Sequence, residues 1–220
     1  METPYLGVHQ TGSRPLVSIS CCKRSVSYRP SSEVYLQVEV RHKLQLVMTI
    51  HEHIPTLKAE RLDLRGPRSE DFPIYRDFFA DAAASHFYGG PMEADRAWRV
   101  LATDLGHWSL RGYGRWSVVE RASGLMIGGC GLWWPEGYPR SELTWWIVPS
   151  ARRNGYALEA SRAAIAFGYD RLGWDLVETH MNDDNVAARA LVQKLGGTKI
   201  LREKFPDGLE RDIFGLPRPH

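Results

Sequence analysis

Hydrophobic and polar residues alternate in short, regular stretches over most of the chain. Leu62 and Leu64 stand between polar neighbours, which predicts a strand. Ser69-Glu70-Asp71 then supplies a helix cap with acids in the first turn, and the pattern predicts a helix that continues to about Ala84. After a break rich in glycine, a second helix with one apolar face is predicted from the spacing of Ala94, Trp98, Leu101, Leu105 and Trp108.

The second half of the chain predicts an alternation of strands and helices. Runs rich in Val, Ile and Trp, separated by turn residues, predict antiparallel strands at 115–120, 125–134 and 142–148. A helix is predicted over 155–172, a strand over 176–182, a helix that stops at Gly196-Gly197, and two short strands around a turn at Pro206-Asp207-Gly208. This order predicts an α+β fold with a mixed, mostly antiparallel central sheet flanked by helices, and not a doubly wound parallel sheet.

The first 50 residues differ from the rest. Ser, Arg and Pro are scattered there, and the one apolar alternation covers residues 34–40. We therefore expect residues 1–50 to be a poorly ordered N-terminal extension and residues 51–220 to form the functional domain. Because the regular pattern begins near Met48, we also expect that the first 47 residues precede the functional chain.

Charge is distributed unevenly along the 220 residues. The formal net charge is +2, but residues 1–47 hold six Lys or Arg against three Asp or Glu, which leaves −1 from Met48 onward. A protein that binds a phosphate backbone needs a basic stripe, and none is present in that part of the sequence. We expect no nucleic-acid partner.

Cysteine usage and hydropathy bear on the compartment. The three cysteines, two of them adjacent at Cys21 and Cys22, give neither a spaced disulfide framework nor pairs of metal ligands, so a reducing compartment and no metal site are expected. No apolar run approaches the roughly 18 residues that span a bilayer, and the start lacks the layout of a secretory signal. The sequence thus favours a cytoplasmic protein with no membrane partner.

The junction between the strand at 142–148 and the next helix has features of a phosphate site. The run Arg152-Arg153-Asn154-Gly155-Tyr156-Ala157 leads directly into the helix. The first N–H groups of a helix lack internal partners and that end is partly positive, so a phosphate can satisfy both. Glycine lets the backbone approach the phosphate, and Arg152 or Arg153 can add a charged fork. Alone, such a loop is more often a plain helix start.

This loop and its surroundings resemble a known family. Residues 152–157 match the R/Q-x-x-G-x-G/A signature of the GCN5-related N-acetyltransferase (GNAT) superfamily, between a strand and a helix as that family requires. Four runs around it resemble the RimJ/RimL-like branch: 127–132, 142–149, 156–160, and 182–185 leading to 193–197. The resemblance covers about residues 57–214. It implies the GNAT fold, with splayed parallel strands at the coenzyme site.

The resemblance also implies acetyl-CoA as co-substrate and an amine as acceptor. The strand that ends at Ile147 and Val148 looks like the one that lends backbone groups to the pantetheine arm. The pyrophosphate would bind the loop amides, so the expected coenzyme site adds Arg152, Arg153, Asn154, Gly155, Tyr156 and Ala157. Asn185 resembles the family asparagine beside the coenzyme arm. Its alternative role is a helix N-cap, and the two roles are compatible.

Acetyl transfer needs a base, because only a neutral amine attacks the thioester. Glu142 is the first candidate, since it opens the coenzyme strand where many relatives have an acid; a solvated glutamate at a strand end is the alternative. His180 is the second candidate, although a lone histidine in a strand is more often packed or exposed. Ala188 and Val192 stand where relatives carry Ser or Tyr, so the thiolate acid is unassigned and catalysis is expected to depend mainly on positioning the two reactants.

The acceptor is not specified by the sequence. The central strands are rich in aromatic residues, most of them expected in the core, though some can line a pocket for a cationic amine: Trp133, Trp134, Tyr138, Trp145 and Trp146. The loops at 87–92 and 135–140 are expected to shape that pocket. An N-acetyltransferase that acts on a protein N-terminus or a small-molecule amine is the main hypothesis. A non-catalytic acyl-CoA sensor and an interaction protein are the alternatives, and the chain is expected to be a monomer or homodimer.

Overall fold

The computed structural model describes residues 8–9, 16–17 and 54–219, which belong to two units, residues 1–50 and 51–220. In the first unit, β1 (Val8–His9) pairs antiparallel with β2 (Leu16–Val17). The expectations of a poorly ordered extension over residues 1–50 and of a functional start at Met48 otherwise fall outside the described residues. The second unit carries all the other described helices and strands.

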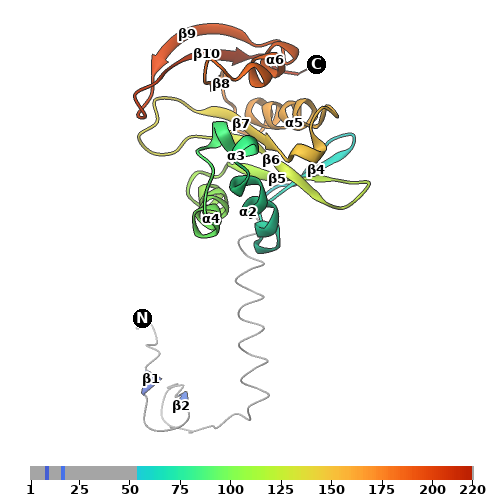
Figure 1. The fold of residues 1–220 in the computed structure, drawn as a ribbon, viewed down its shortest axis with the longest axis vertical. Helices are drawn as coiled ribbons and strands as arrows, with labels where there is room; N and C mark the ends of the chain where they lie inside the picture. Colours follow the sequence, from blue (N-terminus) through green and yellow to red (C-terminus); the bar gives the residue numbers. More distant parts are fainter. Residues whose placement is uncertain (1–7, 10–15, 18–53, 220) are drawn as a thin grey trace, which may run out of the picture. The chain divides into compact units, whose positions relative to one another are not determined.

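A five-stranded antiparallel sheet forms the centre of the second unit (Figure 1). Its strands, in spatial order, are β3 (Leu57–Lys58), β4 (Leu62–Arg65), β5 (Arg115–Glu120), β6 (Met126–Trp133) and β7 (Glu142–Ile147). The sequence predicted four of these strands, and β3 is an addition of two residues. Each strand pairs with its sequence neighbour in this sheet, as expected for strands joined by turns.

A smaller antiparallel sheet follows in the order β8 (Val177–Met181), β10 (Glu210–Leu216), β9 (Thr198–Lys204). Helix α5 (Tyr156–Asp170) carries the chain from the end of β7 to the start of β8, so the two strands run parallel. Side-chain contacts agree with this direction, because Arg140 forms an ion pair with Glu178, and Glu142 contacts His180 two residues further along both segments. No backbone ladder joins these two strands, and the mixed α+β fold with splayed parallel strands is confirmed.

Helices cover both faces of the central sheet. Figure 1 shows α2 (Phe72–Ala80) and α4 (Ala94–Arg111) on one face and α5 on the other. The remaining helical segments are η1 (Ser69–Asp71), α3 (Ala82–Ser85), η2 (His86–Tyr88), η3 (Pro149–Ala151) and α6 (Val186–Lys194). The single helix predicted from Ser69 to Ala84 is therefore wrong. Asp81 is extended and its carboxylate accepts from the N–H groups of Ala83 and Ala84, so a new helix begins there.

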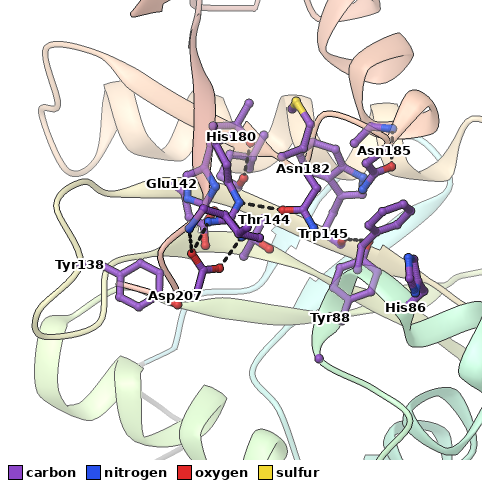
Figure 2. Close-up of a pocket in the computed structure, with 18 residues that line it drawn as sticks. His86, Tyr88, Tyr138, Glu142, Thr144, Trp145, His180, Asn182, Asn185 and Asp207 are labelled. Carbon is purple, nitrogen blue, oxygen red and sulfur yellow. Dashed lines mark hydrogen bonds and ion pairs between the residues drawn. The ribbon is translucent and has the colours of Figure 1, made fainter. Parts of the chain in front are cut away.

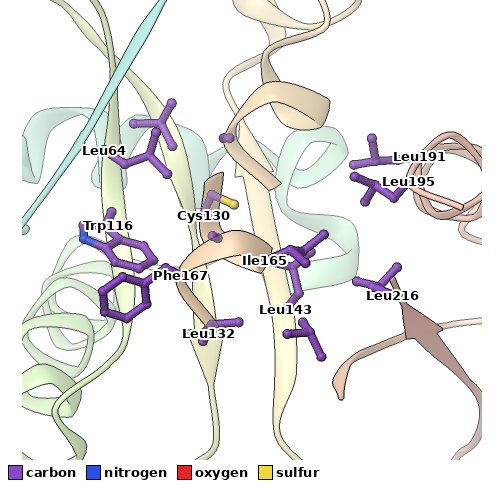
Figure 3. Packing of buried hydrophobic residues seen from close by; sticks show 14 of the residues in the cluster. Leu64, Trp116, Cys130, Leu132, Leu143, Ile165, Phe167, Leu191, Leu195 and Leu216 are labelled. Atoms are coloured by element: carbon purple, nitrogen blue, oxygen red, sulfur yellow. The ribbon is translucent and has the colours of Figure 1, made fainter. Parts of the chain in front are cut away.

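The core is formed where α5 packs on the sheet. Figure 3 shows Ile165 and Phe167 of α5 against Leu143 and Trp116 of the sheet, and the Phe167 and Trp116 rings meet edge to face at 5.1 Å. Trp146 of β7 points to the opposite face, into a cluster with Tyr75, Phe78 and Phe79 of α2. Alternate residues of β7 are thus fixed by packing on two faces, which holds the strand in one register.

Candidate functional site

The loop between β7 and α5 presents a run of free backbone amides. Arg153 has φ 65° and Gly155 has φ 82°, and the first of these is uncommon for a residue with a side chain. The N–H groups of residues 153–158 donate to no other described residue, and the helical ladder starts with Glu159 N–H donating to Gly155. Free amides at a helix start, next to residues with positive φ, are typical of anion-binding sites such as those for a diphosphate.

The edge of β7 that faces β8 is also open. Val148 N–H donates to Ile127 of β6 (2.9 Å), and because ladder bonds alternate along a strand, the backbone of Leu143, Trp145 and Ile147 faces away from β6. The three carbonyl oxygens accept from side chains, namely Thr179 Oγ1 (2.8 Å), the Tyr88 hydroxyl (2.6 Å) and Arg152 Nε (3.0 Å). The N–H groups of Trp145 and Ile147 lie on the edge from which β8 diverges, so an extended ligand can bind there.

Two expected coenzyme residues have other partners. Both backbone groups of Val148 bond within the protein, since its carbonyl also accepts from Ala151 N–H (3.0 Å). The Arg152 guanidinium donates to carbonyl oxygens of Ile147 and Ala84 and does not point to the loop amides. Trp145, rather than Val148, is the second residue whose backbone faces the open edge.

A cavity of about 510 Å³ lies beside this edge (Figure 2). Its walls come from η2, the start of β7, the end of β8, the start of α6 and the β9–β10 turn. It brings together Glu142, His180 and Asn185, three of the expected site residues. The loop at 87–92 contributes Phe87 to Gly89, whereas the loop at 135–140 contributes Tyr138 alone.

Comparison with known proteins identifies the family. Residues 61–198 match the family model described as the acetyltransferase (GNAT) domain. YoaA of Bacillus subtilis strain 168, an uncharacterized N-acetyltransferase, is 27% identical over 173 residues, which are 75% of this chain and 98% of that protein.

Solved structures give the same result. The acetyltransferase of Agrobacterium tumefaciens strain C58 is 30% identical with a TM-score of 0.69, over 74% of this chain and 95% of that one. The chain belongs to the GNAT acetyltransferase family. The structure of RimL, a ribosomal L7/L12 α-N-protein acetyltransferase, shares the fold at 12% identity and a TM-score of 0.62, over 74% of this chain and 93% of that one. The GNAT superfamily with RimJ/RimL-like relatives, predicted from the sequence, is confirmed.

GNAT enzymes use acetyl-CoA, and the residues present fit such a ligand. The free amides of the loop suit its diphosphate, and the open edge of β7 suits an extended arm with amide groups. In the described part of the chain, no group of three or more His, Cys, Asp or Glu side chains is arranged to hold a metal ion. None of the described helices is long and apolar enough to cross a membrane.

Glu142 and His180 meet at one end of the cavity of this GNAT domain. Glu142 Oε2 lies 2.7 Å from His180 Nε2, and both side chains are largely buried. Nε2 nevertheless lacks a hydrogen-bond partner, because the two atoms are close without being aligned for a hydrogen bond. The His180 ring also contacts Phe205 at 4.1 Å between centroids. The two candidates for the base therefore lie in contact with each other at the cavity lining, with Nε2 of His180 buried against the carboxylate.

Asn185 caps a helix, which is the structural alternative that the sequence left open. It is the N-cap of α6, where its Oδ1 accepts from Ala188 N–H (3.1 Å), and it also lines the cavity. Its side-chain amide N–H groups are left for a ligand. Ala188 lines the cavity without a hydroxyl, whereas Val192 is fully buried in the core.

Arg61 was missed by sequence reasoning, although it lies directly against the phosphate loop. Its guanidinium donates to Glu159 Oε2 (2.8 Å) and to the Asn154 carbonyl (3.0 Å), and it stacks over the Tyr156 ring at 4.7 Å. A β-carbon placed on Gly155 would be 3.4 Å from Arg61 Nη2. Only the tertiary structure brings this residue to a loop more than 90 positions away.

Tyr88 supplies a hydroxyl to the cavity, yet it is a poor acid. Burial raises the pKa of Tyr88 to about 12, against the opposing effect of the positive charge of Arg152. A thiolate whose conjugate acid has a pKa of about 8.5 cannot easily take a proton from such a group. Tyr88 instead fixes the Trp145 carbonyl, and the thiolate acid stays unassigned.

Proposed function

We propose that the chain is an N-acetyltransferase that moves the acetyl group of acetyl-CoA to a primary amine, either a protein N-terminus or a small molecule, by direct attack in a ternary complex. One observation carries this proposal. Glu142, in contact with His180 of β8, stands at the start of β7, the open edge runs along β7, and the loop with the free amides follows its end. A coenzyme bound along β7 with its diphosphate on the loop would therefore bring its acyl end toward the base.

In this proposal each part of the site has one task. The amides of Arg153 to Ala157 bind the diphosphate and Arg61 holds that loop in place. The backbone of Trp145 and Ile147 orients the arm, and the amide of Asn185 binds near its end. The bound thioester supplies an activated acyl carbon.

Glu142 takes the proton of the acceptor ammonium, directly or through water. The amine nitrogen then forms a bond to the acyl carbon, and the C–S bond breaks with its electron pair on sulfur. The second proton of the amine passes through water to that sulfur, which gives the free thiol and the N-acetyl amide. Bringing the two reactants together accounts for much of the rate, because proximity alone contributes several kcal/mol.

A second function, an acyl-CoA sensor without turnover, is kept for one reason. Ala188 and Val192 provide no hydroxyl to protonate a leaving thiolate. Thiol release from acetyl-CoA in the presence of a panel of amines distinguishes the two functions. Amine-dependent release supports the enzyme, whereas coenzyme-dependent stabilisation with no release for any amine supports the sensor.

The base is tested in the same assay with Glu142→Gln. We expect kcat to fall about 100-fold or more with little change in the KM for acetyl-CoA, because a general base contributes about 10²–10⁴-fold. His180→Asn serves as the matched variant. If His180→Asn abolishes turnover while Glu142→Gln does not, His180 is the base and the assignment of Glu142 is wrong.

A further inference from the structure

Among the described residues, the charged side chains that line the cavity offer no free cation to an acidic acceptor. Apart from histidines, the charged residues of the lining are two carboxylates, Glu142 and Asp207, and one guanidinium, Arg211. Asp207 and Arg211 belong to the β9–β10 hairpin, which closes the cavity on the side of Glu142 (Figure 2). The charge of the lining is therefore negative by one when these three groups are counted.

Arg211 is already committed to partners within the protein. Its Nε donates to Asn182 Oδ1 (2.8 Å), and its two terminal nitrogens form a fork with the carboxylate of Asp207. The guanidinium also stacks over the Phe205 ring at 5.0 Å, and the side chain is only 11% exposed. Held by this fork, by Asn182 and by the Phe205 ring, Arg211 is not free to turn to an acceptor carboxylate.

The two histidines of the lining do not supply the positive charge that Arg211 withholds from a ligand. Nε2 of His180 faces the carboxylate of Glu142 at 2.7 Å. His86 is exposed, where an ion pair with a ligand contributes little. The aromatic walls at Phe87 and Tyr138 instead favour a cation over an anion.

We infer that the acceptor is a primary amine with no carboxylate next to its nitrogen, such as the amine of a peptide N-terminus or of a decarboxylated small molecule, and that free amino acids are excluded. This inference rests on the proposed function and narrows its acceptor class. A carboxylate on the carbon beside the amine would enter a site that holds Glu142 and has no free positive partner among the described residues. Two negative charges placed close together repel. The Asp207–Arg211 pair is what makes the site selective.

The test uses acceptors that differ only in the carboxylate. Phenylalanine, phenylalaninamide and phenethylamine form one triplet, and serine, serinamide and ethanolamine form a second. Only the neutral amine attacks the thioester, and a carboxamide on the neighbouring carbon lowers the pKa of the acceptor ammonium, which by itself speeds the reaction. The main comparison is therefore between each amino acid and its decarboxylated amine. We expect kcat/KM to be at least tenfold higher for the carboxylate-free acceptors in any triplet that is acetylated.

The outcomes are separable. An amino acid acetylated as well as its decarboxylated amine would overturn this inference and leave the proposed function standing. Acetyl-CoA binding with no acetylation of any amine, including short peptides with a free N-terminus, would overturn the proposed function and the inference with it.

A charge variant tests the role of the pair. Asp207→Asn keeps the size of the turn residue but frees the Arg211 fork, so we expect the preference for the carboxylate-free acceptor to fall at least threefold. Asp95→Asn, which removes an exposed ion pair with Arg99 on α4 outside the cavity, is the control and should leave the preference unchanged. An unchanged preference in Asp207→Asn would contradict the selectivity assigned to the pair.

Discussion

At the scale of single residues, Arg61 lies outside any motif yet contacts the loop that we propose as the coenzyme site. Its bonds to Glu159 and to the Asn154 carbonyl hold the loop whose free amides we propose as the diphosphate site. We expect Arg61→Gln to raise the KM for acetyl-CoA about tenfold, because a charge-assisted bond contributes roughly 1.5–3 kcal/mol, with kcat changed less. Steady-state kinetics at saturating amine measure this change.

Arg76→Gln is the matched control for Arg61, since Arg76 pairs with Asp77 on the exposed face of α2. That variant should leave the KM for acetyl-CoA unchanged. An Arg61→Gln enzyme with unaltered KM and a lowered melting temperature would show that Arg61 acts on stability alone.

Asp71 is a second residue with a defined task, which is to join β4 to β5. Its buried carboxylate accepts from Arg65 (2.6 Å), from Arg68 N–H (2.9 Å) and from Ser117 Oγ (2.6 Å). Burial would raise the pKa of Asp71, but the hydrogen bonds from Arg65 and Ser117 outweigh burial and leave this pKa below its ordinary value. The carboxylate therefore stabilises the fold above the unfolded pKa of about 3.9, and this contribution is lost as pH falls further.

We expect Asp71→Asn to lower the free energy of unfolding by about 3 kcal/mol at neutral pH, because it breaks a buried ion pair. The difference in the free energy of unfolding between wild type and variant should stay constant above about pH 5 and become smaller below about pH 4. Urea unfolding across this pH range provides the measurement. Asp77→Asn, at an exposed position, should change stability by less than about 0.5 kcal/mol. A gap that widens in acid would contradict the direction given for this pKa.

At the scale of elements, local pattern located the strands and helices but not their interruptions. β5 and β7 lie within the predicted stretches because alternation and turn residues are local signals. The break of the first predicted helix at Asp81 was missed because helical spacing continues across it, and only the cap bonds of Asp81 show that a second helix begins. The splay between β7 and β8 came from family resemblance, since no local pattern encodes it.

Strand β6 is rich in glycine because neighbouring side chains and backbone occupy the space of a β-carbon. A β-carbon on Gly129 would lie 2.5 Å from the Trp146 indole nitrogen, whereas one on Gly106 of α4 would meet nothing within 4 Å. We expect Gly129→Ala to destabilise the protein by about 1–3 kcal/mol through overpacking. Gly106→Ala should stabilise it by about 0.5–1 kcal/mol, because alanine favours the helix. Thermal unfolding of the two variants tests both predictions. Melting temperatures that shift equally and in the same direction would contradict them.

At the scale of the whole molecule, the site combines one contiguous motif with residues from distant segments. The loop at 152–157 was predictable from sequence because its amides are neighbours in the chain. Arg61 and Arg211 were not, since the position before β4 and strand β10 reach the site only through tertiary packing. The sequence also placed Val148 on the open edge, and this was wrong. Which residues of β7 turn their backbone groups toward β6, and which turn them away, depends on the pairing of the two strands.

This assembly predicts where coenzyme binding should protect backbone amides from hydrogen exchange. A ligand that lies along the open edge of β7 and ends on the loop bonds to N–H groups that have no described partner in the free chain. We expect acetyl-CoA to slow exchange in two peptides, one with Trp145 and Ile147 and one with residues 153–157, and to leave α4 and β9 unchanged. Exchange measured by mass spectrometry with and without saturating acetyl-CoA tests this map. Protection confined to α4 or β9, or absent from both expected peptides while the coenzyme raises the melting temperature, would place the coenzyme elsewhere on the molecule.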